Sequence, residues 1–167
     1  MQPGSIVFMT NSPEQTEQLG KELGQLLESG DLITLSGELG GGKTCFVRGI
    51  VAGSSPSALD MVASPTFAIL NEYPGGIPIY HYDCYRLRGS DDAIELGLEE
   101  HLLGTGICLV EWPDRIRDLL PPERLDIIFE YRGDSIRQIS ITPLGKRGAE
   151  LVKKLESIGN HGKKELV

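Results

Sequence analysis

The chain has 167 residues, of which 40% are hydrophobic and 24% charged, values that fit one globular domain over residues 1–167. No apolar run approaches the roughly 18 residues that span a membrane, and residues 1–11 lack the basic flank and apolar core of a signal peptide, so we expect a cytoplasmic protein with no membrane contact. The net charge of −8 argues against strong nucleic-acid binding by this chain alone, because such domains usually carry a basic surface.

The cysteines do not form a recognisable framework. Cys45, Cys84 and Cys108 are odd in number and widely spaced, and no two of them make a C-x-x-C pair. This pattern predicts reduced thiols rather than a zinc site or disulfides.

Residues 12–31 predict an amphipathic helix. Ser12 suits the N-cap, Pro13 suits the first helical position, and Gln15 completes a capping box. Leucines follow at helical spacing, and Gly30 is expected to end the helix.

A glycine cluster separates the next two predicted elements. The apolar stretch 31–37 predicts a buried strand, and 44–53 is compatible with a helix. Residues 54–65 are polar and interrupted by proline, which predicts a loop.

The rest of the chain predicts two hairpins, two helices and a further buried strand. The expected elements are a hairpin over 66–85, a helix over 90–102 with Ser90 as its N-cap, a strand over 106–112, a hairpin over 124–143, a helix over 145–159 and a frayed polar tail from about 160. Alternating strands and helices indicate an α/β fold, with a mixed, mostly parallel central sheet flanked by helices.

Residues 37–44 read G-x-x-x-x-G-K-T, the pattern of a phosphate-binding loop. Glycine allows successive backbone N–H groups to point at phosphate oxygens, and the following helix adds partial positive charge. Lys43 would reach the β- and γ-phosphates and the Thr44 hydroxyl would bind magnesium. The predicted P-loop contacts to the nucleotide are Gly37, Glu38, Leu39, Gly40, Gly41, Gly42, Lys43, Thr44 and Cys45. A chance glycine-rich turn is the alternative, but the predicted strand before it and helix after it favour the loop.

The sequence indicates the nucleotide base and the acidic magnesium ligands less specifically than it indicates the phosphate-binding loop. No N-K-x-D motif is present, which favours adenine over guanine. Asp83 and Glu111 each end a predicted strand, where a magnesium–nucleotide site needs a carboxylate, although each could simply cap the next turn. His81 shares a strand face with Asp83 and could be its partner. Thr66 could sense the γ-phosphate, but composition alone favours a proline turn there.

Five segments occur in an order that resembles the TsaE (YjeE) family, the small bacterial ATPases of tRNA threonylcarbamoyladenosine biosynthesis. They read GELGGGKTCFVRG, SPTFAILNEY, HYDCYRL, ELGLEEHL and GICLVEWPDRI, within a match over residues 12–145. The phosphate loop is generic, whereas H-x-D-x-Y-R followed by L-V-E-W-P is specific.

The resemblance implies a single-domain P-loop ATPase that uses ATP and Mg²⁺ and works with TsaD and TsaB, which carry out the transfer to tRNA. It implies that Lys43 and Thr44 serve the phosphates and magnesium, and that Asp83 and Glu111 are the acids near magnesium. Thr66 corresponds to a switch-like threonine, and adenine is expected near Ser12. Glu38, Cys84 and residues 54–61 depart from the usual pattern, but none of these departures removes a ligand.

Two rival functions are compatible with the same loop. A small nucleotide or metabolite kinase would use arginines such as Arg86, Arg88, Arg115 and Arg117 to hold a second phosphorylated substrate. A binding module would retain ATP without hydrolysing it.

Overall fold

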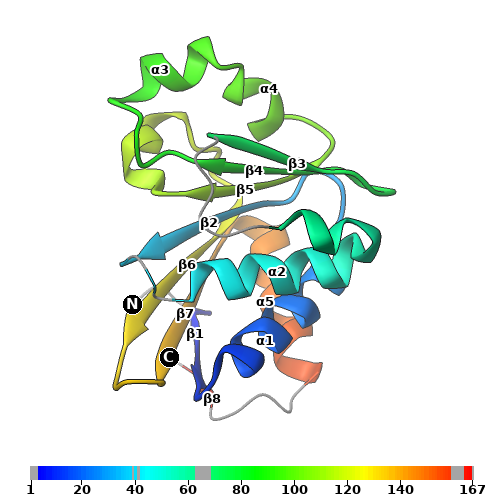
Figure 1. The fold of residues 1–167 in the computed structure, drawn as a ribbon, viewed down its shortest axis with the longest axis vertical. Helices are drawn as coiled ribbons and strands as arrows, with labels where there is room; N and C mark the ends of the chain where they lie inside the picture. Colours follow the sequence, from blue (N-terminus) through cyan, green and yellow to red (C-terminus); the bar gives the residue numbers. More distant parts are fainter. Residues whose placement is uncertain (1–3, 39, 41, 63–68, 159–163, 167) are drawn as a thin grey trace.

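One mixed sheet runs through the molecule, and helices cover parts of both its faces (Figure 1). The computed structural model describes residues 4–38, 40, 42–62, 69–158 and 164–166. Among these residues the sheet has the order β3-β4-β5-β2-β6-β7-β1-β8. The strands are β1 (Ile6–Thr10), β2 (Leu32–Gly37), β3 (Leu70–Tyr73), β4 (Ile79–Asp83), β5 (Ile107–Glu111), β6 (Arg124–Tyr131), β7 (Arg137–Leu144) and β8 (Lys164–Leu166).

The helices follow the strands in an α/β alternation. They are α1 (Pro13–Leu26), α2 (Lys43–Ser54), α3 (Ser90–Glu95), α4 (Leu98–Leu102) and α5 (Gly145–Ile158), with 3₁₀ helices η1 (Pro56–Met61) and η2 (Pro113–Leu119). Strands β4, β5, β2 and β6 pair in parallel, whereas β3 and the β7-β1-β8 side pair antiparallel. The predicted α/β fold with a mixed sheet is confirmed. The sheet is not mostly parallel as predicted, because the described strands make three parallel pairings at its centre and four antiparallel pairings toward its margins.

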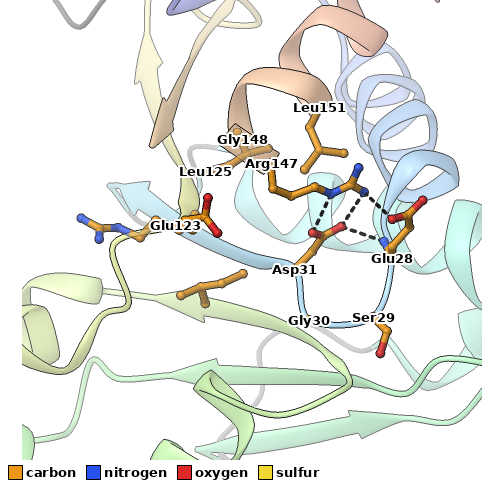
Figure 2. Close-up of a pocket in the computed structure, with 11 residues that line it drawn as sticks. Glu28, Ser29, Gly30, Asp31, Glu123, Leu125, Arg147, Gly148 and Leu151 are labelled. Carbon is orange, nitrogen blue, oxygen red and sulfur yellow. Dashed lines mark hydrogen bonds and ion pairs between the residues drawn. The ribbon is translucent and has the colours of Figure 1, made fainter. Parts of the chain in front are cut away.

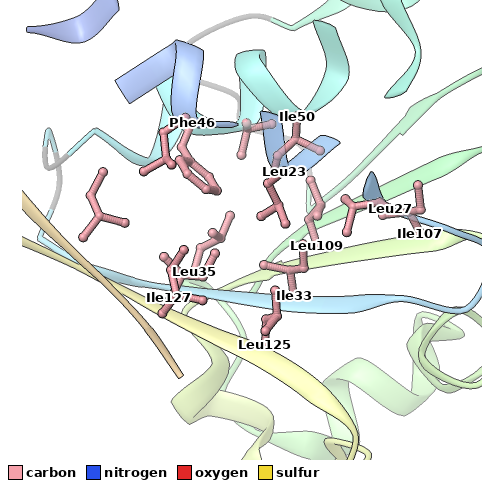
Figure 3. Packing of buried hydrophobic residues seen from close by; sticks show 14 of the residues in the cluster. Leu23, Leu27, Ile33, Leu35, Phe46, Ile50, Ile107, Leu109, Leu125 and Ile127 are labelled. Atoms are coloured by element: carbon pink, nitrogen blue, oxygen red, sulfur yellow. The ribbon is translucent and has the colours of Figure 1, made fainter. Parts of the chain in front are cut away.

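Side-chain alternation along the central strands builds a core on each face of the sheet. On one face, Ile33 and Leu35 of β2 and Leu109 of β5 pack with side chains of α1 and α2 (Figure 3). On the other face, Cys108 and Val110 pack with residues of α3, α4 and η2. The phosphate-loop sequence lies at the carboxyl end of β2, between these two layers.

Helices α1 and α2 pack at very short range because glycines face each other. A Cβ added to Gly20 or Gly24 of α1 would collide with backbone carbonyls of Phe46 and Ile50. The reverse holds for Gly49 and Gly53 of α2, which face the backbone of α1. These two G-x-x-x-G spacings therefore let the helix that carries the loop lie backbone to backbone on α1.

The start of α1 confirms the predicted cap, but its end differs from the prediction. Ser12 is the N-cap, since the Gln15 N–H donates to Ser12 Oγ at 3.2 Å. The predicted capping box differs in one partner, because Gln15 Oε1 accepts from the N–H of Asn11, at 2.7 Å, and not from that of Ser12. The helix stops at Leu26 rather than at Gly30, because Leu27 is extended and buried. A turn follows at once, in which Glu28 N donates to Asp31 Oδ2 at 2.7 Å.

The predicted helix over 90–102 is two short helices. Gly97 has a φ of +78° and separates α3 from α4. Ser90 is not the N-cap, because the cap is Gly89 and the Ser90 hydroxyl bonds to the Asp118 carboxylate. The prediction overlooked that a glycine in the left-handed region ends a helix as readily in the middle of a pattern as at its edge.

The remaining differences lie in the loops and at the sheet margin. Strand β1 was not predicted, and within the predicted loop 54–65 the residues Pro56–Met61 form η1. The tail is not frayed over Lys164–Leu166, which pairs with β1. In the last hairpin Leu125, Ile127 and Phe129 point inward as predicted, whereas Tyr131 is exposed.

Candidate functional site

The backbone of the glycine loop takes conformations that favour glycine. Gly37 has a φ of +142°, Gly40 of +78° and Gly42 of +106°. At Gly37 a Cβ would also lie 2.6 Å from the carbonyl oxygen of Phe129, on the neighbouring strand. Gly42 caps α2 without a side-chain hydrogen bond, so the first N–H groups of the helix remain available for an anion. Leu39 and Gly41 lie outside the described residues.

Lys43 is the first residue of α2 and its side chain is buried at the carboxyl end of the sheet. Its Nζ donates to the Gly37 carbonyl at 2.7 Å and lies 4.0 Å from Glu111 Oε1. Burial lowers the pKa of the Lys43 ammonium, and the charges of Glu111 and Asp83 partly oppose that shift. A cation held in this way is poised to gain from a nearby polyanion, because burial strengthens charge interactions.

The structure brings Asp83 and Glu111 together next to the loop. They are register partners on the parallel strands β4 and β5, so both side chains project from the same face of the sheet. Glu111 Oε2 lies 2.7 Å from His81 Nε2, whereas Asp83 Oδ1 accepts from the Tyr85 N–H at 3.0 Å. Asp83 therefore does cap its turn, and it also contributes charge at Lys43.

The other predicted nucleotide contacts lie in the loop, on the first turn of α2 and at the start of α1. Thr44 is exposed on its first turn and Glu38 is exposed in the loop. Cys45 is half-buried, and burial raises the pKa of its thiol, with the nearby Glu17 charge acting in the same direction. The Ser12 hydroxyl caps α1, and that helix approaches the loop through Thr16, whose Cγ2 would lie 3.5 Å from a Cβ at Gly42. The predicted switch residue Thr66 lies outside the described residues.

Trp112 covers Lys43 from the side of β5. Its ring centroid lies 4.5 Å from Lys43 Nζ and 4.9 Å from the Tyr85 ring. Within the described part of the chain it is the only non-glycine residue with positive φ, at +57°. Such a conformation costs on the order of 1–3 kcal/mol and is found mainly at functional sites. The backbone N–H of Trp112 donates to the Leu35 carbonyl at 3.3 Å, and this hydrogen bond connects the turn after β5 to β2.

His81 partners Glu111 rather than Asp83, the partner that the strand pattern suggested. It is buried, and its Nδ1 lies 3.4 Å from the Tyr73 hydroxyl on β3. The two contacts of His81, with Tyr73 and with Glu111, together connect the adjacent strands β3, β4 and β5. Sequence alone gives no signal for them, because they depend on which strands are neighbours and in which register.

The oxygen ligands at the site suit magnesium without forming a closed metal cage. The candidates are the Thr44 hydroxyl and the carboxylates of Asp83 and Glu111, and such hard oxygen donors are what Mg²⁺ prefers. Among the residues that the structure describes, no three His, Cys, Asp or Glu side chains are grouped as a metal site. Mg²⁺ is often held by one or two carboxylates together with phosphate oxygens, so this donor set fits it.

A second charged cluster lies at the opposite end of β2 (Figure 2). Arg147 of α5 donates from Nε to Asp31 Oδ1 and from Nη2 to Asp31 Oδ2, both at 2.9 Å, and from Nη2 to the Leu26 carbonyl at 3.0 Å. The pair borders a cavity of about 190 Å³. Hydrogen bonds to Asp31 raise the pKa of the Arg147 guanidinium still further. In this cluster, the Arg147 guanidinium and the Asp31 carboxylate are hydrogen-bonded directly to each other.

A strand, a loop with three glycines at positive φ and a helix that begins at a buried lysine define a phosphate-loop α/β protein. The chain belongs to the TsaE family: the model of "Threonylcarbamoyl adenosine biosynthesis protein TsaE" matches residues 10–139. That family takes part in tRNA threonylcarbamoyladenosine biosynthesis. Within the described residues, no helix has the length and apolar character to cross a membrane.

Relatives match over most of their length. The TsaE protein of Bacillus subtilis is 41% identical over 156 residues, which cover 93% of this chain and 96% of the relative. The TsaE protein of Treponema pallidum is 36% identical over 133 residues, which cover 80% of this chain and 97% of the relative. A crystal structure of Bacillus subtilis YdiB superposes with a TM-score of 0.78 at 36% identity, covering 93% of this chain and 97% of that one.

Proposed function

We propose that this protein is a magnesium-dependent ATPase that supports threonylcarbamoyladenosine modification of tRNA in the cytoplasm, together with TsaD-like and TsaB-like proteins. Membership of the TsaE family supports the pathway. The observation that carries the proposed activity is Lys43, a buried cation at the start of a helix, beside a glycine loop and two carboxylates.

The proposed roles follow from the positions of these groups. The N–H groups at the start of α2 and the Lys43 ammonium would hold the phosphates and stabilise charge that develops as water attacks the γ-phosphate. Mg²⁺, when bound through Thr44 and one or both carboxylates, would neutralise phosphate charge. Asp83 and Glu111 remain candidates for orienting the attacking water, and Thr66 for sensing the γ-phosphate.

The kinase alternative gains no support from the arginines that would hold an acceptor. Arg88 pairs with Asp92, and Arg117 pairs with Asp114, each within its own short segment. Arg115 lies over the Tyr85 ring, 6.0 Å from its centroid. Each of these three guanidinium groups thus contacts a side chain close by, on its own segment or on Tyr85.

Phosphate release decides among the three functions. We expect low release by the protein alone, stimulation by TsaD- and TsaB-like partners, and loss in Lys43→Ala and Glu111→Ala variants. Phosphoryl transfer to a small acceptor without partners would instead establish a kinase. Tight ATP retention with no release in the presence of the partners would establish a binding module, and failure to associate with TsaD would contradict the proposed pathway role.

A further inference from the structure

A buried chain of polar contacts leads away from the loop. Tyr73, His81 and Glu111 lie on the neighbouring strands β3, β4 and β5, and their side chains are consecutive hydrogen-bonding partners. Tyr73 is 3% exposed and His81 5%. The chain ends at Glu111 Oε1, 4.0 Å from Lys43 Nζ.

The contacts define one arrangement of protons for a neutral imidazole. A carboxylate only accepts hydrogen bonds, so Nε2 of His81 carries the proton and donates to Glu111 Oε2 over 2.7 Å. Nδ1 is then the acceptor for the Tyr73 hydroxyl, at 3.4 Å. Each polar group in the chain is matched, as a buried network requires.

The two oxygens of Glu111 therefore have different tasks. Oε2 is held by His81, which leaves Oε1 directed toward Lys43 and the loop. Asp83 has no such support from a buried side chain among its described contacts, since its Oδ1 accepts from the backbone of Tyr85 in an exposed turn. The buried hydrogen bond from His81 therefore supports Glu111, the acid that lies next to Lys43.

We propose that His81 is a positioning residue that holds the Glu111 carboxylate in the orientation needed for ATP hydrolysis, and that Tyr73 in turn holds the His81 ring. The inference rests on the ATPase function proposed above. His81 acts through Glu111 and does not touch the nucleotide, so its removal slows turnover and leaves ATP affinity nearly unchanged.

Two amide substitutions test this role as a matched pair. In His81→Gln the side-chain amide nitrogen reaches the place of Nε2 and can still donate to Glu111, whereas in His81→Asn it reaches only the place of Nδ1. We expect kcat for phosphate release to fall on the order of 10- to 100-fold in His81→Asn, the usual range for such supporting residues. In His81→Gln kcat stays within about 3-fold of the wild type, and KM and the ATP dissociation constant stay within about 3-fold in both variants.

The combination with Glu111→Ala provides the control for specificity. If His81 works only through Glu111, His81→Asn adds nothing further to the loss in Glu111→Ala. Equal kcat in His81→Asn and the wild type, equal loss in the Gln and Asn variants, or a loss confined to ATP affinity would overturn the proposal.

A measurement without nucleotide separates this proposal from the ATPase proposal. Nitrogen-15 NMR of the imidazole rings should show His81 protonated at Nε2 with a slowly exchanging proton, and Glu111→Ala should make that proton exchange rapidly. The signal is assigned by its disappearance in His81→Asn. If the wild type never releases phosphate, the ATPase proposal fails, while a His81 ring that carries no proton at Nε2 would contradict the positioning role by itself.

Discussion

The two ends of β2 each carry a largely buried pair of opposite charges, and the pairs differ in how closely the two charges approach. At the amino end, Arg147 and Asp31 share two hydrogen bonds of 2.9 Å. At the carboxyl end, Lys43 and Glu111 stay 4.0 Å apart, and each is held mainly by another group. We therefore expect the loss of one partner to lower stability at the amino end and to weaken the proposed nucleotide binding at the carboxyl end.

The strongest test of this contrast is Lys43→Ala. Removing the ammonium deletes the charge proposed to hold the phosphates, so we expect phosphate release to fall on the order of 10³-fold, about 4 kcal/mol of transition-state stabilisation. Partner-stimulated phosphate release measures it. The unfolding temperature without nucleotide should change little, and a collapse of the fold in this variant would remove the distinction between the two ends of β2.

Arg147→Ala should have the opposite profile. It leaves the Asp31 carboxylate buried without its partner, which we expect to cost about 3 kcal/mol in the free energy of unfolding. Chemical denaturation measures the loss, and ATP affinity should remain at the wild-type value. The control is Lys154→Ala, which breaks an exposed pair with Glu150 and should cost less than about 0.5 kcal/mol.

Gly49→Ala should lower both the stability of the fold and the affinity for ATP, because α1 contacts both ends of β2. Thr16 of α1 lies next to Gly42 of the loop, and the Leu26 carbonyl at the end of α1 accepts from Arg147. The added methyl would collide with the Glu17 carbonyl and push α1 away from α2, at a cost of about 2 kcal/mol. ATP affinity should fall as well, since α2 starts at Lys43. Thermal unfolding and ATP calorimetry measure the two effects. Gly76→Ala is the matched control, because a Cβ there meets nothing within 4 Å.

The smallest effect concerns the thiols. Burial raises the pKa of Cys84 and of Cys108 to about 12, so both stay protonated and inaccessible, whereas Cys45 is only partly buried beside the loop. A thiol reagent should modify Cys45 alone in the folded protein. Because the Cys45 pKa is raised above its ordinary value, its modification rate should keep rising beyond pH 9.

The rate of Cys45 modification should also be compared with and without ATP. Nucleotide in the loop should slow Cys45 modification a few-fold, and the three thiols should react alike once the protein is unfolded. Rapid modification of Cys84 in the folded state would contradict the buried arrangement. Absence of ATP protection at Cys45 would place that residue outside the nucleotide contacts.

Sequence predicted the parts of the molecule that depend on local patterns. The loop conformation follows from Gly37, Gly40 and Gly42, and the α1 cap follows from Ser12 and Gln15, because both depend on residues close together in the chain. The adjacent acids were also predictable in outline, since Asp83 and Glu111 end strands whose carboxyl ends meet at one edge.

Other features depend on which strands become neighbours. The His81–Glu111 contact needs β4 beside β5 in one particular register, and the left-handed Trp112 needs a turn pinned to β2. Strand β8 is three residues long and pairs with β1, at the other end of the chain. A single sequence carries no local signal for these long-range choices.

Pairing between β1 and β8 also makes the chain a candidate for circular permutation. Ile6 is the register partner of Leu166, so the first and last strands lie side by side (Figure 1). A linker could therefore join these two strands, while the exposed turn between β3 and β4 at Gly76 offers a place to open the chain. The order of elements along the polypeptide could change in this way with the sheet, the loop and both charged clusters left in place.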